Sequence, residues 1–352
     1  MESNRNKNKR RMMRRALQLA RRGWGRTSPN PMVGAVVEKD GRIVGEGFHR
    51  TAGTAHAEVE ALQDAGEAAR GATLYVNLEP CSTHGRTPPC TDAVIEAGVT
   101  RVVVGTKDPL PTHAGRGLEI LKEHGIQTES DVCRQACENL NAAFFCWARY
   151  ERPFVCLKMA MTLDGKIATY SGNSQWISGE SARKHVQKMR QWADAVMVGA
   201  ETVRQDDPGL TVREPKNWHP QPRRIVWSRN PDKVEHDLHI WQDKDNQPEF
   251  VHPDSATSWS EFLHGLGKEK ITALLIEGGG ELAASALNAG AVDQVKFFIA
   301  PKILGGRASR PVVGGPPPMS LDDCRELHQY KMTKVGNDYL ITGYLSNVHR
   351  IN

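Results

Sequence analysis

Hydrophobic residues in the first 150 positions follow two spacings. Runs such as Val102-Val103-Val104, bounded by Arg101 and Gly105, are typical of buried strands. Near the start, apolar residues recur at positions 12, 13, 16, 17 and 20, which is the spacing of one helix face. The order of these patterns predicts a layered α/β sandwich. We expect helices over residues 9–22, 56–69, 90–97, 118–124 and 130–149, and strands over residues 33–37, 43–48, 72–78 and 101–105.

A second set of patterns begins after Arg152-Pro153, and we divide the chain there into domains of residues 1–151 and 152–352. Proline fixes φ and removes a backbone donor, so it separates elements. Residues 213–255 are rich in Pro, Asn, Asp and His and predict loops or weak strands. We expect strands over residues 154–159, 195–198, 224–227, 273–276 and 295–300, and helices over residues 182–192 and 281–289.

One imidazole and two thiols in the first domain are spaced as ligands of a zinc ion. His56 begins a predicted helix, Cys81 follows the strand at 72–78, and Cys90 begins the next helix. Three ligands of these types leave the fourth tetrahedral position open for water, as in catalytic zinc sites. Zinc lowers the pKa of that water enough to give hydroxide near neutral pH. Glu58 is two residues from His56, so its carboxylate could carry protons at the site. His-x-Glu followed by Pro-Cys and a further Cys is the pattern of zinc deaminases that act on nucleobases.

The formal charge is concentrated at the start of the chain. Residues 1–26 carry ten Lys and Arg residues against Glu2, a net charge of +9, which leaves −4 for the rest of a chain whose total is +5. A mildly acidic body argues against a nucleic-acid-binding face across it. The basic segment itself has two interpretations. It is either an arm for RNA or an acidic partner, or a frayed end followed by the solvated face of the first helix.

Cysteine content and hydropathy indicate the compartment. The seven cysteines are an odd number, and no apolar run approaches the roughly 20 residues that span a bilayer. The basic start leads into an amphipathic segment, which is unlike a signal peptide. Free thiols in a reducing, cytoplasmic compartment fit better than a disulfide framework. Cys133 and Cys137 share a predicted helix face, where we expect core packing.

Two polar clusters allow both a structural and a functional interpretation. Asn30 lies in the rigid turn at 28–31, where it could present its amide to a polar ligand or only form the turn. Glu277-Gly278-Gly279-Gly280 stands between an apolar strand and a helix. Backbone amides at such a junction can hold a phosphate, and tight packing of a helix on a strand would need the same glycines.

The chain as a whole resembles the bifunctional riboflavin biosynthesis proteins, in which a pyrimidine deaminase is fused to a pyrimidine reductase. The resemblance extends from residue 9 to residue 345. One mark of it is the loop of eight residues between Cys81 and Cys90, where nucleobase deaminases usually have two. The matching motifs lie at residues 29–34, 56–58, 79–90, 108–109 and 114–117 in the first half, and at 157–158, 163–165, 174–177, 206–208, 210–213, 277–279, 300–302 and 304–306 in the second.

For the first domain, the resemblance implies a cytidine-deaminase-like α/β/α sandwich. Its zinc site would remove the ring amine of 2,5-diamino-6-ribosylamino-4(3H)-pyrimidinone 5′-phosphate, with Glu58 passing protons to the departing ammonia. The loop at 82–87 would cover the substrate. The implied substrate contacts are Asn30, His49 and Arg86, the last of these near the phosphate.

For the second domain, the resemblance implies a dihydrofolate-reductase-like α/β fold that uses NADPH to reduce the ribosyl group to a ribityl chain. The glycines at 278–280 are therefore not interpreted as a Rossmann motif. Arg190 and Arg213 suit a phosphate as guanidinium forks. The implied NADP contacts are Ala160, Trp176, Thr202, Asp206, Ser228, Gly279, Gly280, Glu281, Leu282, Ala283, Ala284 and Ser285, and the implied substrate contacts are Ser174, Arg190, Leu210, Arg213 and Glu277.

Three functions stay open on the sequence. The first is a bifunctional enzyme for a small pyrimidine ribose phosphate, with Zn2+ and NADPH as cofactors and without nucleic-acid or membrane partners. The resemblance adds a homo-oligomer formed through the reductase domain. The second is a deaminase whose reductase half has degenerated into a scaffold. The third is a zinc deaminase that the basic arm directs to RNA.

Overall fold

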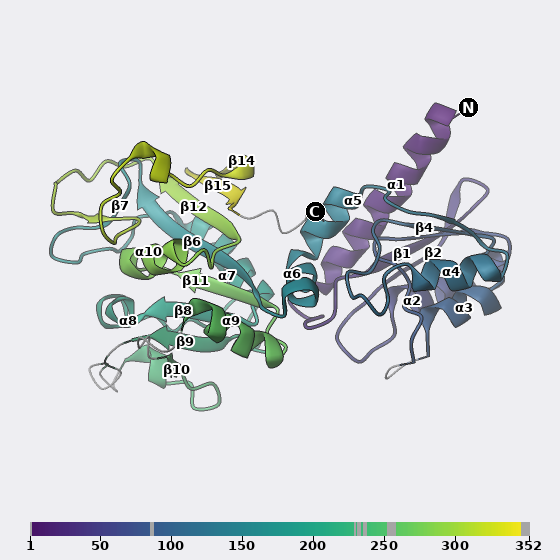
Figure 1. The fold of residues 1–352 in the computed structure, drawn as a ribbon, viewed down its shortest axis with the longest axis horizontal. Helices are drawn as coiled ribbons and strands as arrows, with labels where there is room; N and C mark the ends of the chain where they lie inside the picture. Colours follow the sequence, from purple (N-terminus) through teal and green to yellow (C-terminus); the bar gives the residue numbers. More distant parts are fainter. Residues whose placement is uncertain are drawn as a thin grey trace. The chain divides into compact units, whose positions relative to one another are not determined.

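The computed structural model of the chain describes residues 2–84, 88–228, 230, 234, 238–251 and 258–345. They form two compact units, Met1–Tyr150 and Glu151–Asn352, and each unit is described by itself (Figure 1).

The first unit contains a mixed β-sheet between layers of helices. Within the described residues this sheet has five strands, in the order β2-β1-β3-β4-β5. Strand β1 is antiparallel to β2 and β3, whereas β3, β4 and β5 are parallel. The strands are β1 (Gly34–Lys39), β2 (Arg42–Phe48), β3 (Thr73–Val76), β4 (Arg101–Val104) and β5 (Gln127–Glu129).

Alternating strand residues bury against helices on the two faces of this sheet. Val36, Tyr75 and Val103 pack with α1 on one face, and the neighbouring strand positions pack with α2, α3 and α4 on the other. The predicted α/β/α sandwich is therefore confirmed (Figure 1). The helices are α1 (Glu2–Ala20), α2 (Ala57–Ala65), α3 (Cys90–Glu96), α4 (Arg116–Glu123), α5 (Arg134–Leu140) and α6 (Ala142–Tyr150), with short 3-10 turns η1 (Arg21–Gly23) and η2 (Gly66–Ala69).

Strand β2 lies directly against helix α2 because two of its residues have no side chain. A Cβ added at Gly45 would lie 2.3 Å from the Ala61 carbonyl oxygen, and one at Gly47 would lie 2.4 Å from the Ala57 carbonyl oxygen. Both separations are shorter than any real contact of a Cβ atom. The two glycines therefore set how closely α2 approaches the sheet.

The single helix predicted at 130–149 is two helices, α5 and α6, separated at Asn141. The Asn141 side chain accepts the Met32 N–H at 2.8 Å and donates to the Met32 carbonyl at 2.9 Å. This long-range clamp has no helical signature in the sequence. Helix α1 also begins earlier than predicted, at Glu2, and the polar strand β5 was not predicted.

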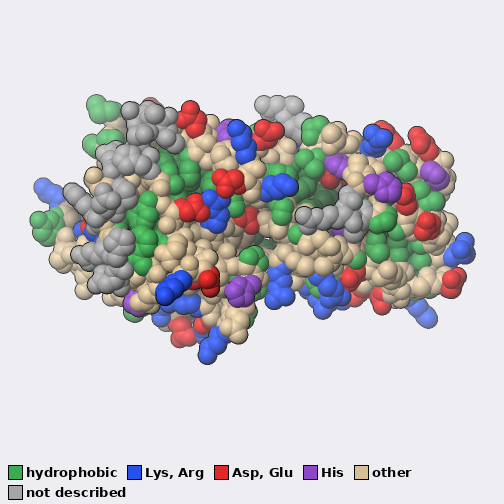
Figure 2. Space-filling view, turned by 90° about the horizontal axis from the view of Figure 1, so that it is seen from below, with side chains coloured by type: hydrophobic (Ala, Val, Ile, Leu, Met, Phe, Trp, Pro, Cys, Tyr) green, Lys and Arg blue, Asp and Glu red, His purple; other side chains and the backbone are tan. Residues whose placement is uncertain are grey.

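The basic first segment is part of the folded unit. Met12 and Met13 on α1 are fully buried, Lys9 pairs with Glu129 at 2.6 Å, and Arg15 pairs with Glu46 at 2.6 Å. These contacts favour the interpretation of a solvated helix face. On the face drawn in Figure 2, Lys and Arg side chains are mixed with Asp and Glu.

The second unit is built on a larger sheet with helices on both faces. In the described part of the chain, this sheet has eight strands in the order β10-β9-β8-β11-β6-β12-β15-β14. The strands from β10 to β12 are parallel, and the last two are antiparallel. The strands are β6 (Phe154–Thr162), β8 (Ala195–Gly199), β9 (Arg223–Trp227), β10 (Glu249–Val251), β11 (Ala273–Glu277), β12 (Gln294–Ala300), β14 (His328–Val335) and β15 (Asp338–Tyr344).

Helices α9 and α10 pack their apolar residues on one face of this sheet, and α7 covers the other. The predicted α/β class of the second half is confirmed. A separate pair of strands, β7 (Lys166–Ala168) and β13 (Arg310–Pro311), lies beside it. The helices are α7 (Glu180–Trp192), α8 (Ala200–Asp206), α9 (Trp259–Lys268) and α10 (Gly280–Asn288), with 3-10 turns at His239–Trp241 and Leu321–Asp323.

The prediction missed elements at the edges of the second unit. Strand β14 is almost fully exposed, and Tyr330 and Met332 alternate with polar residues over only a few positions. Helices α8 and α9 and strand β10 were also not predicted. All seven cysteines lie in described residues and none of them forms a disulfide, with Cys137 buried in the core beside α1. Within the described chain, every helix is too short or too polar to cross a lipid bilayer.

Candidate metal centre and sheet-edge site

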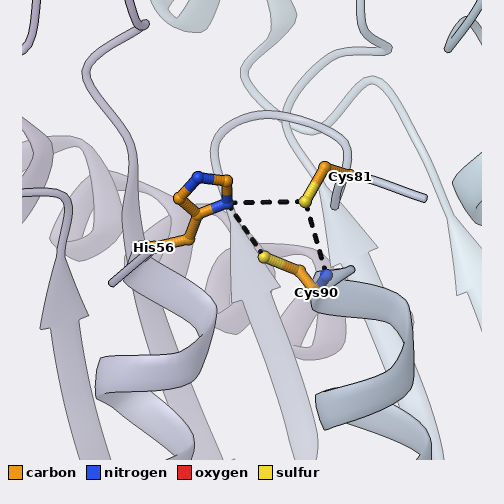
Figure 3. Close-up of side chains that lie close together, drawn as sticks. All are labelled: His56, Cys81 and Cys90. Carbon is orange, nitrogen blue, oxygen red and sulfur yellow. Dashed lines mark hydrogen bonds between the residues drawn. The ribbon is translucent and has the colours of Figure 1, made fainter. Parts of the chain in front are cut away.

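Three secondary-structure ends bring His56, Cys81 and Cys90 together. His56 is the residue just before α2, Cys81 follows β3, and Cys90 is the first residue of α3. His56 Nδ1 lies 3.1 Å from Cys90 Sγ and 3.4 Å from Cys81 Sγ (Figure 3). The Cys90 backbone N–H donates to Cys81 Sγ at 3.3 Å. Figure 3 shows the ring nitrogen and both sulfur atoms facing one another.

This arrangement fits a zinc ion. The three ligand atoms lie within 4.8 Å of one another, and they are one nitrogen and two sulfurs. Tetrahedral zinc with ordinary bond lengths separates such a nitrogen from a sulfur by about 3.6 Å. The observed distances of 3.1 and 3.4 Å are close to that value. A donor set of one His and two Cys is also the chemistry that zinc prefers.

Burial and hydrogen bonding shift the charges of these groups. Hydrogen bonds from Cys90 and His56 lower the pKa of Cys81 to about 4. The pKa of Cys90 is raised, first by its hydrogen bond to Cys81 and then by burial. Glu58, in the first turn of α2, is only 3% exposed, and burial raises its pKa to about 7, with the charge of Cys81 adding to the shift. A carboxyl group with this pKa can give and take protons near neutral pH.

Asn30 and His49 lie together beside the metal centre. Asn30 Nδ2 is 3.1 Å from His49 Nε2, and His49 Nδ1 is 3.1 Å from the Ala55 carbonyl oxygen. Because a carbonyl only accepts, Nδ1 carries the proton and Nε2 accepts from Asn30. Burial lowers the pKa of His49, in agreement with a neutral ring. The ring of His49 meets the ring of His56 edge to face at 5.3 Å. Arg86 lies outside the described residues.

In the second unit, the predicted NADP contacts gather where neighbouring parallel strands end. Ala160 lies near the end of β6, Thr202 follows β8, Ser228 follows β9 and Gly279 follows β11. These strands are adjacent in the order β9-β8-β11-β6. The carboxyl edge of a parallel sheet is where α/β proteins bind ligands. Trp176, which is 63% exposed, stacks on the Arg183 guanidinium at 4.6 Å.

Several predicted contacts bind one another. Ser174 Oγ donates to Asp206 Oδ1. Arg190 and Glu277 form a buried two-point ion pair, from Nε to Oε1 at 2.6 Å and from a terminal nitrogen to Oε2 at 3.1 Å. Arg190 also donates to the Thr211 carbonyl at 3.1 Å. The Arg190 guanidinium is therefore occupied by Glu277, which corrects the expectation that it is free to bind a phosphate. The side chain of Arg213, by contrast, is exposed.

Packing limits what residues 279–285 could offer to a cofactor. The side chains of Leu282, Ala283 and Ala284 are buried, so these residues present only backbone to a ligand. Ser285 Oγ accepts the indole N–H of Trp259 at 3.0 Å. A Cβ at Gly280 would lie 2.7 Å from the Pro311 carbonyl oxygen, which favours tight packing as the reason for that glycine. Leu210 is likewise buried.

Two buried charged groups and one half-buried lysine have no role assigned from the sequence. Glu79, two residues before Cys81, accepts hydrogen bonds from four backbone amides of residues 108–118. Lys158 is the cross-strand neighbour of Glu277, and burial lowers the pKa of its amine. Arg224 is 1% exposed and donates to the Gly209 carbonyl at 3.1 Å. Each stands in a strand or at its end, where only tertiary structure distinguishes it from a surface charge.

Two family models match the chain. The model of the RibD C-terminal domain matches residues 153–341, and the zinc-binding region of cytidine and deoxycytidylate deaminases matches residues 6–106. The riboflavin biosynthesis protein RibD of Synechocystis sp. is 41% identical over 95% of this chain and 95% of its own length. That of Escherichia coli is 43% identical over 84% of this chain and 88% of its own length.

Two solved structures are similar to nearly the whole chain. RibD of Acinetobacter baumannii has a TM-score of 0.86 at 35% identity, covering 96% of this chain and 99% of its own. The diaminohydroxyphosphoribosylaminopyrimidine deaminase/5-amino-6-(5-phosphoribosylamino)uracil reductase of Thermotoga maritima also has a TM-score of 0.86 at 35% identity, covering 97% of this chain and 99% of its own. The fold, the metal-type donor set and both family matches lead to one conclusion: the chain belongs to the RibD family of bifunctional riboflavin biosynthesis proteins.

Proposed function

We propose that residues 1–151 deaminate a diaminopyrimidine ribose phosphate with Zn2+, and that residues 152–352 reduce the product with NADPH. The deaminase assignment rests on one observation, the close approach of His56 Nδ1 to the thiols of Cys81 and Cys90. The reductase assignment rests on the match to the RibD C-terminal domain and on the polar groups at the carboxyl edge of the sheet. Both substrates are small molecules.

In the deaminase, His56, Cys81 and Cys90 would hold zinc, which would supply a nucleophilic water near neutral pH. Glu58 takes a proton from the attacking water and delivers it to the leaving nitrogen. A C–O bond forms at the amine-bearing ring carbon, the C–N bond breaks, and ammonia leaves. Asn30, held by His49 at 3.1 Å, is placed to orient the pyrimidine. Arg86 is proposed to meet the phosphate.

In the reductase, bound NADPH would supply a hydride for the first carbon of the opened ribosyl chain, where the C=N bond to the amine nitrogen becomes a single bond and that nitrogen takes a proton from solvent. We assign NADP to the carboxyl edge of the sheet, where the backbone at the start of α10 can face a phosphate. Glu277 faces the substrate and Arg190 positions its carboxylate. Arg213, whose side chain is exposed, is the proposed phosphate contact, and Ser174 and Leu210 line the same site. The remaining assigned NADP contacts are Ala160, Trp176, Thr202, Asp206 and Ser228.

The replacement Glu58→Gln tests this proposal. It keeps the size of the side chain and all three zinc ligands but removes the proton carrier. We expect zinc content to be retained, ammonia release from the diaminopyrimidine to fall by at least about 100-fold, and NADPH oxidation with the deaminated intermediate to be unchanged. The control is Glu60→Gln on the same helix, whose carboxylate pairs with Arg50 at 2.9 Å. Equal deamination by Glu58→Gln and Glu60→Gln would refute the assignment.

The same assays separate the other two functions. Deamination without any NADPH oxidation by the wild-type chain would identify the second half as a scaffold. Ammonia release from RNA, and none from the free pyrimidine, would identify an RNA deaminase. We propose a cytoplasmic enzyme with neither nucleic-acid nor membrane partners, for which cysteines without disulfides agree with a reducing compartment.

We also propose a homo-oligomer formed through the second unit. Among the strands that the structure describes, β14 is the outermost of its sheet, and the backbone of such an edge strand can pair with a strand of another chain. Tyr330 and Met332 on this strand are 72% and 63% exposed, and Tyr339 on β15 is 43% exposed. Replacing Tyr330 and Met332 by lysine should lower the mass measured by light scattering to that of a smaller species.

A further inference from the structure

A single buried carboxylate lies between the zinc-ligand segment and the loop that follows β4. Glu79 is 4% exposed. Its Oε2 accepts the backbone N–H groups of Asp108 at 3.1 Å and Gly115 at 2.9 Å. Its Oε1 accepts those of Gly117 at 3.0 Å and Leu118 at 3.3 Å. Four amides of the segment 108–118, which runs from the loop after β4 into α4, therefore converge on the two oxygens of one side chain.

This arrangement stabilises a negative charge away from water. Gly117 and Leu118 belong to the first turn of α4, whose free amides and dipole favour an anion at that end. Hydrogen bonds to an ionised acceptor are stronger than those between neutral groups. Glu79 is thus bonded far more firmly to the 108–118 loop than an ordinary turn residue would be.

The position of Glu79 in the chain connects this loop to the metal centre. Only Pro80 separates Glu79 from Cys81, and the Glu79 backbone N–H is fixed by the Thr106 carbonyl at 3.0 Å. Both its backbone and its side chain are therefore held, so Pro80 and Cys81 leave β3 along a fixed path. At the end of that path, Cys81 Sγ meets His56 Nδ1 at 3.4 Å.

We propose that Glu79 is a positioning residue of the deaminase: by binding four amides of the 108–118 loop, it fixes Cys81 for metal binding. This inference rests on the proposed zinc deaminase. Groups that orient the ligands of a metal commonly change its affinity by about 10- to 100-fold when they are replaced. A role in folding alone would instead lower thermal stability and leave the affinity of the folded protein for zinc unchanged.

Glu79→Gln in the full chain is the discriminating variant. The amide keeps one accepting oxygen but turns an NH2 group toward two backbone N–H donors, so one pair of hydrogen bonds is lost. The matched control is Glu119→Gln, which removes an exposed carboxylate from the first turn of the same helix. Glu79→Asp keeps the charge on a shorter side chain and serves as the conservative variant.

The primary measurement is zinc affinity, by competition with a chromophoric chelator. We expect a loss of about 10- to 100-fold for Glu79→Gln, a smaller loss for Glu79→Asp, and less than about twofold for Glu119→Gln. Co2+ in place of zinc should also give an altered thiolate charge-transfer band in Glu79→Gln. NADPH oxidation with the deaminated intermediate should be equal in all variants.

Three results would overturn the inference. In the first, Glu79→Gln binds zinc as tightly as Glu119→Gln. In the second, Glu79→Gln lowers thermal stability but leaves the zinc affinity of the folded protein at the wild-type value, which would limit Glu79 to a role in folding. The third is a wild-type chain that binds no zinc and releases no ammonia, which would refute the proposed deaminase together with the inference. The first two leave the proposed deaminase intact.

Discussion

The ion pair between Arg190 and Glu277 allows a quantitative prediction. The two side chains are 10% and 7% exposed, and two hydrogen bonds of 2.6 and 3.1 Å join them. Replacing Arg190 by methionine leaves a buried carboxylate without its main partner, which costs about 3–5 kcal/mol. Coulomb's law gives a similar value, about 4 kcal/mol for charges about 4 Å apart at an effective dielectric of about 20. Lys158 and Arg213 still attract the Glu277 carboxylate. We therefore expect the free energy of unfolding to fall by about 3 kcal/mol.

Urea unfolding followed by tryptophan fluorescence measures this loss. Six of the eight tryptophans lie in Glu151–Asn352, so the signal reports mainly on the second unit. With a slope of about 2 kcal/mol per molar urea, a loss of 3 kcal/mol lowers the midpoint by about 1.5 M. NADPH oxidation should fall strongly, and ammonia release should persist. A midpoint shift below about 0.3 M would refute the reasoning.

The dependence on pH provides a second check on this ion pair. Burial alone would raise the pKa of Glu277, but Arg190, with Lys158 and Arg213, outweighs it and the net shift is downward. A lowered pKa contributes stability above the unfolded value of about 4.3, and this contribution is lost as the pH falls through the folded value. In Arg190→Met, no guanidinium at position 190 opposes the effect of burial on the pKa of Glu277, so this pKa should rise. The stability gap between the two proteins should therefore narrow from pH 7 toward pH 4, and a constant gap would contradict this account.

Three further replacements test other parts of the structure. Cys90→Ser should lose zinc by metal analysis and should lose ammonia release, with NADPH oxidation retained; full zinc content would contradict the ligand assignment. Gly280→Ala adds a Cβ 2.7 Å from the Pro311 carbonyl and should lower the free energy of unfolding by about 1–3 kcal/mol, and an unchanged urea midpoint would exclude tight packing there. Trp259→Phe removes the 3.0 Å hydrogen bond to Ser285 and should cost about 1 kcal/mol, whereas Trp241→Phe measures the loss from changing an indole elsewhere.

The sequence predicted the parts of this protein that depend on local pattern. His56 and Cys90 are at helix starts and Cys81 is beyond a strand end, all of which short-range spacing indicates. The break at Asn141 was missed because its cause is Met32, which is 109 positions away. No periodicity reports such a distant partner.

The chemistry of the second unit was less accessible for the same reason. Arg190 and Glu277 were each predicted to face substrate, but their pairing joins residues 87 positions apart. The sequence could not show that the Arg190 guanidinium binds the Glu277 carboxylate. Strand β14 was missed for another reason, since its mostly exposed side chains give only a short alternation of apolar and polar residues.

The two glycines of strand β2, Gly45 and Gly47, affect how a survey of random variants would be interpreted. Gly47 faces Ala57, the residue between His56 and Glu58, and Gly45 faces Ala61 one turn later. An alanine at Gly47 would push the backbone that carries both the imidazole and the carboxyl group, although the new methyl would touch neither. Such a survey should therefore find variants at Gly47 that have lost deamination but still oxidise NADPH. On activity data alone, this glycine would be mistaken for a substrate contact.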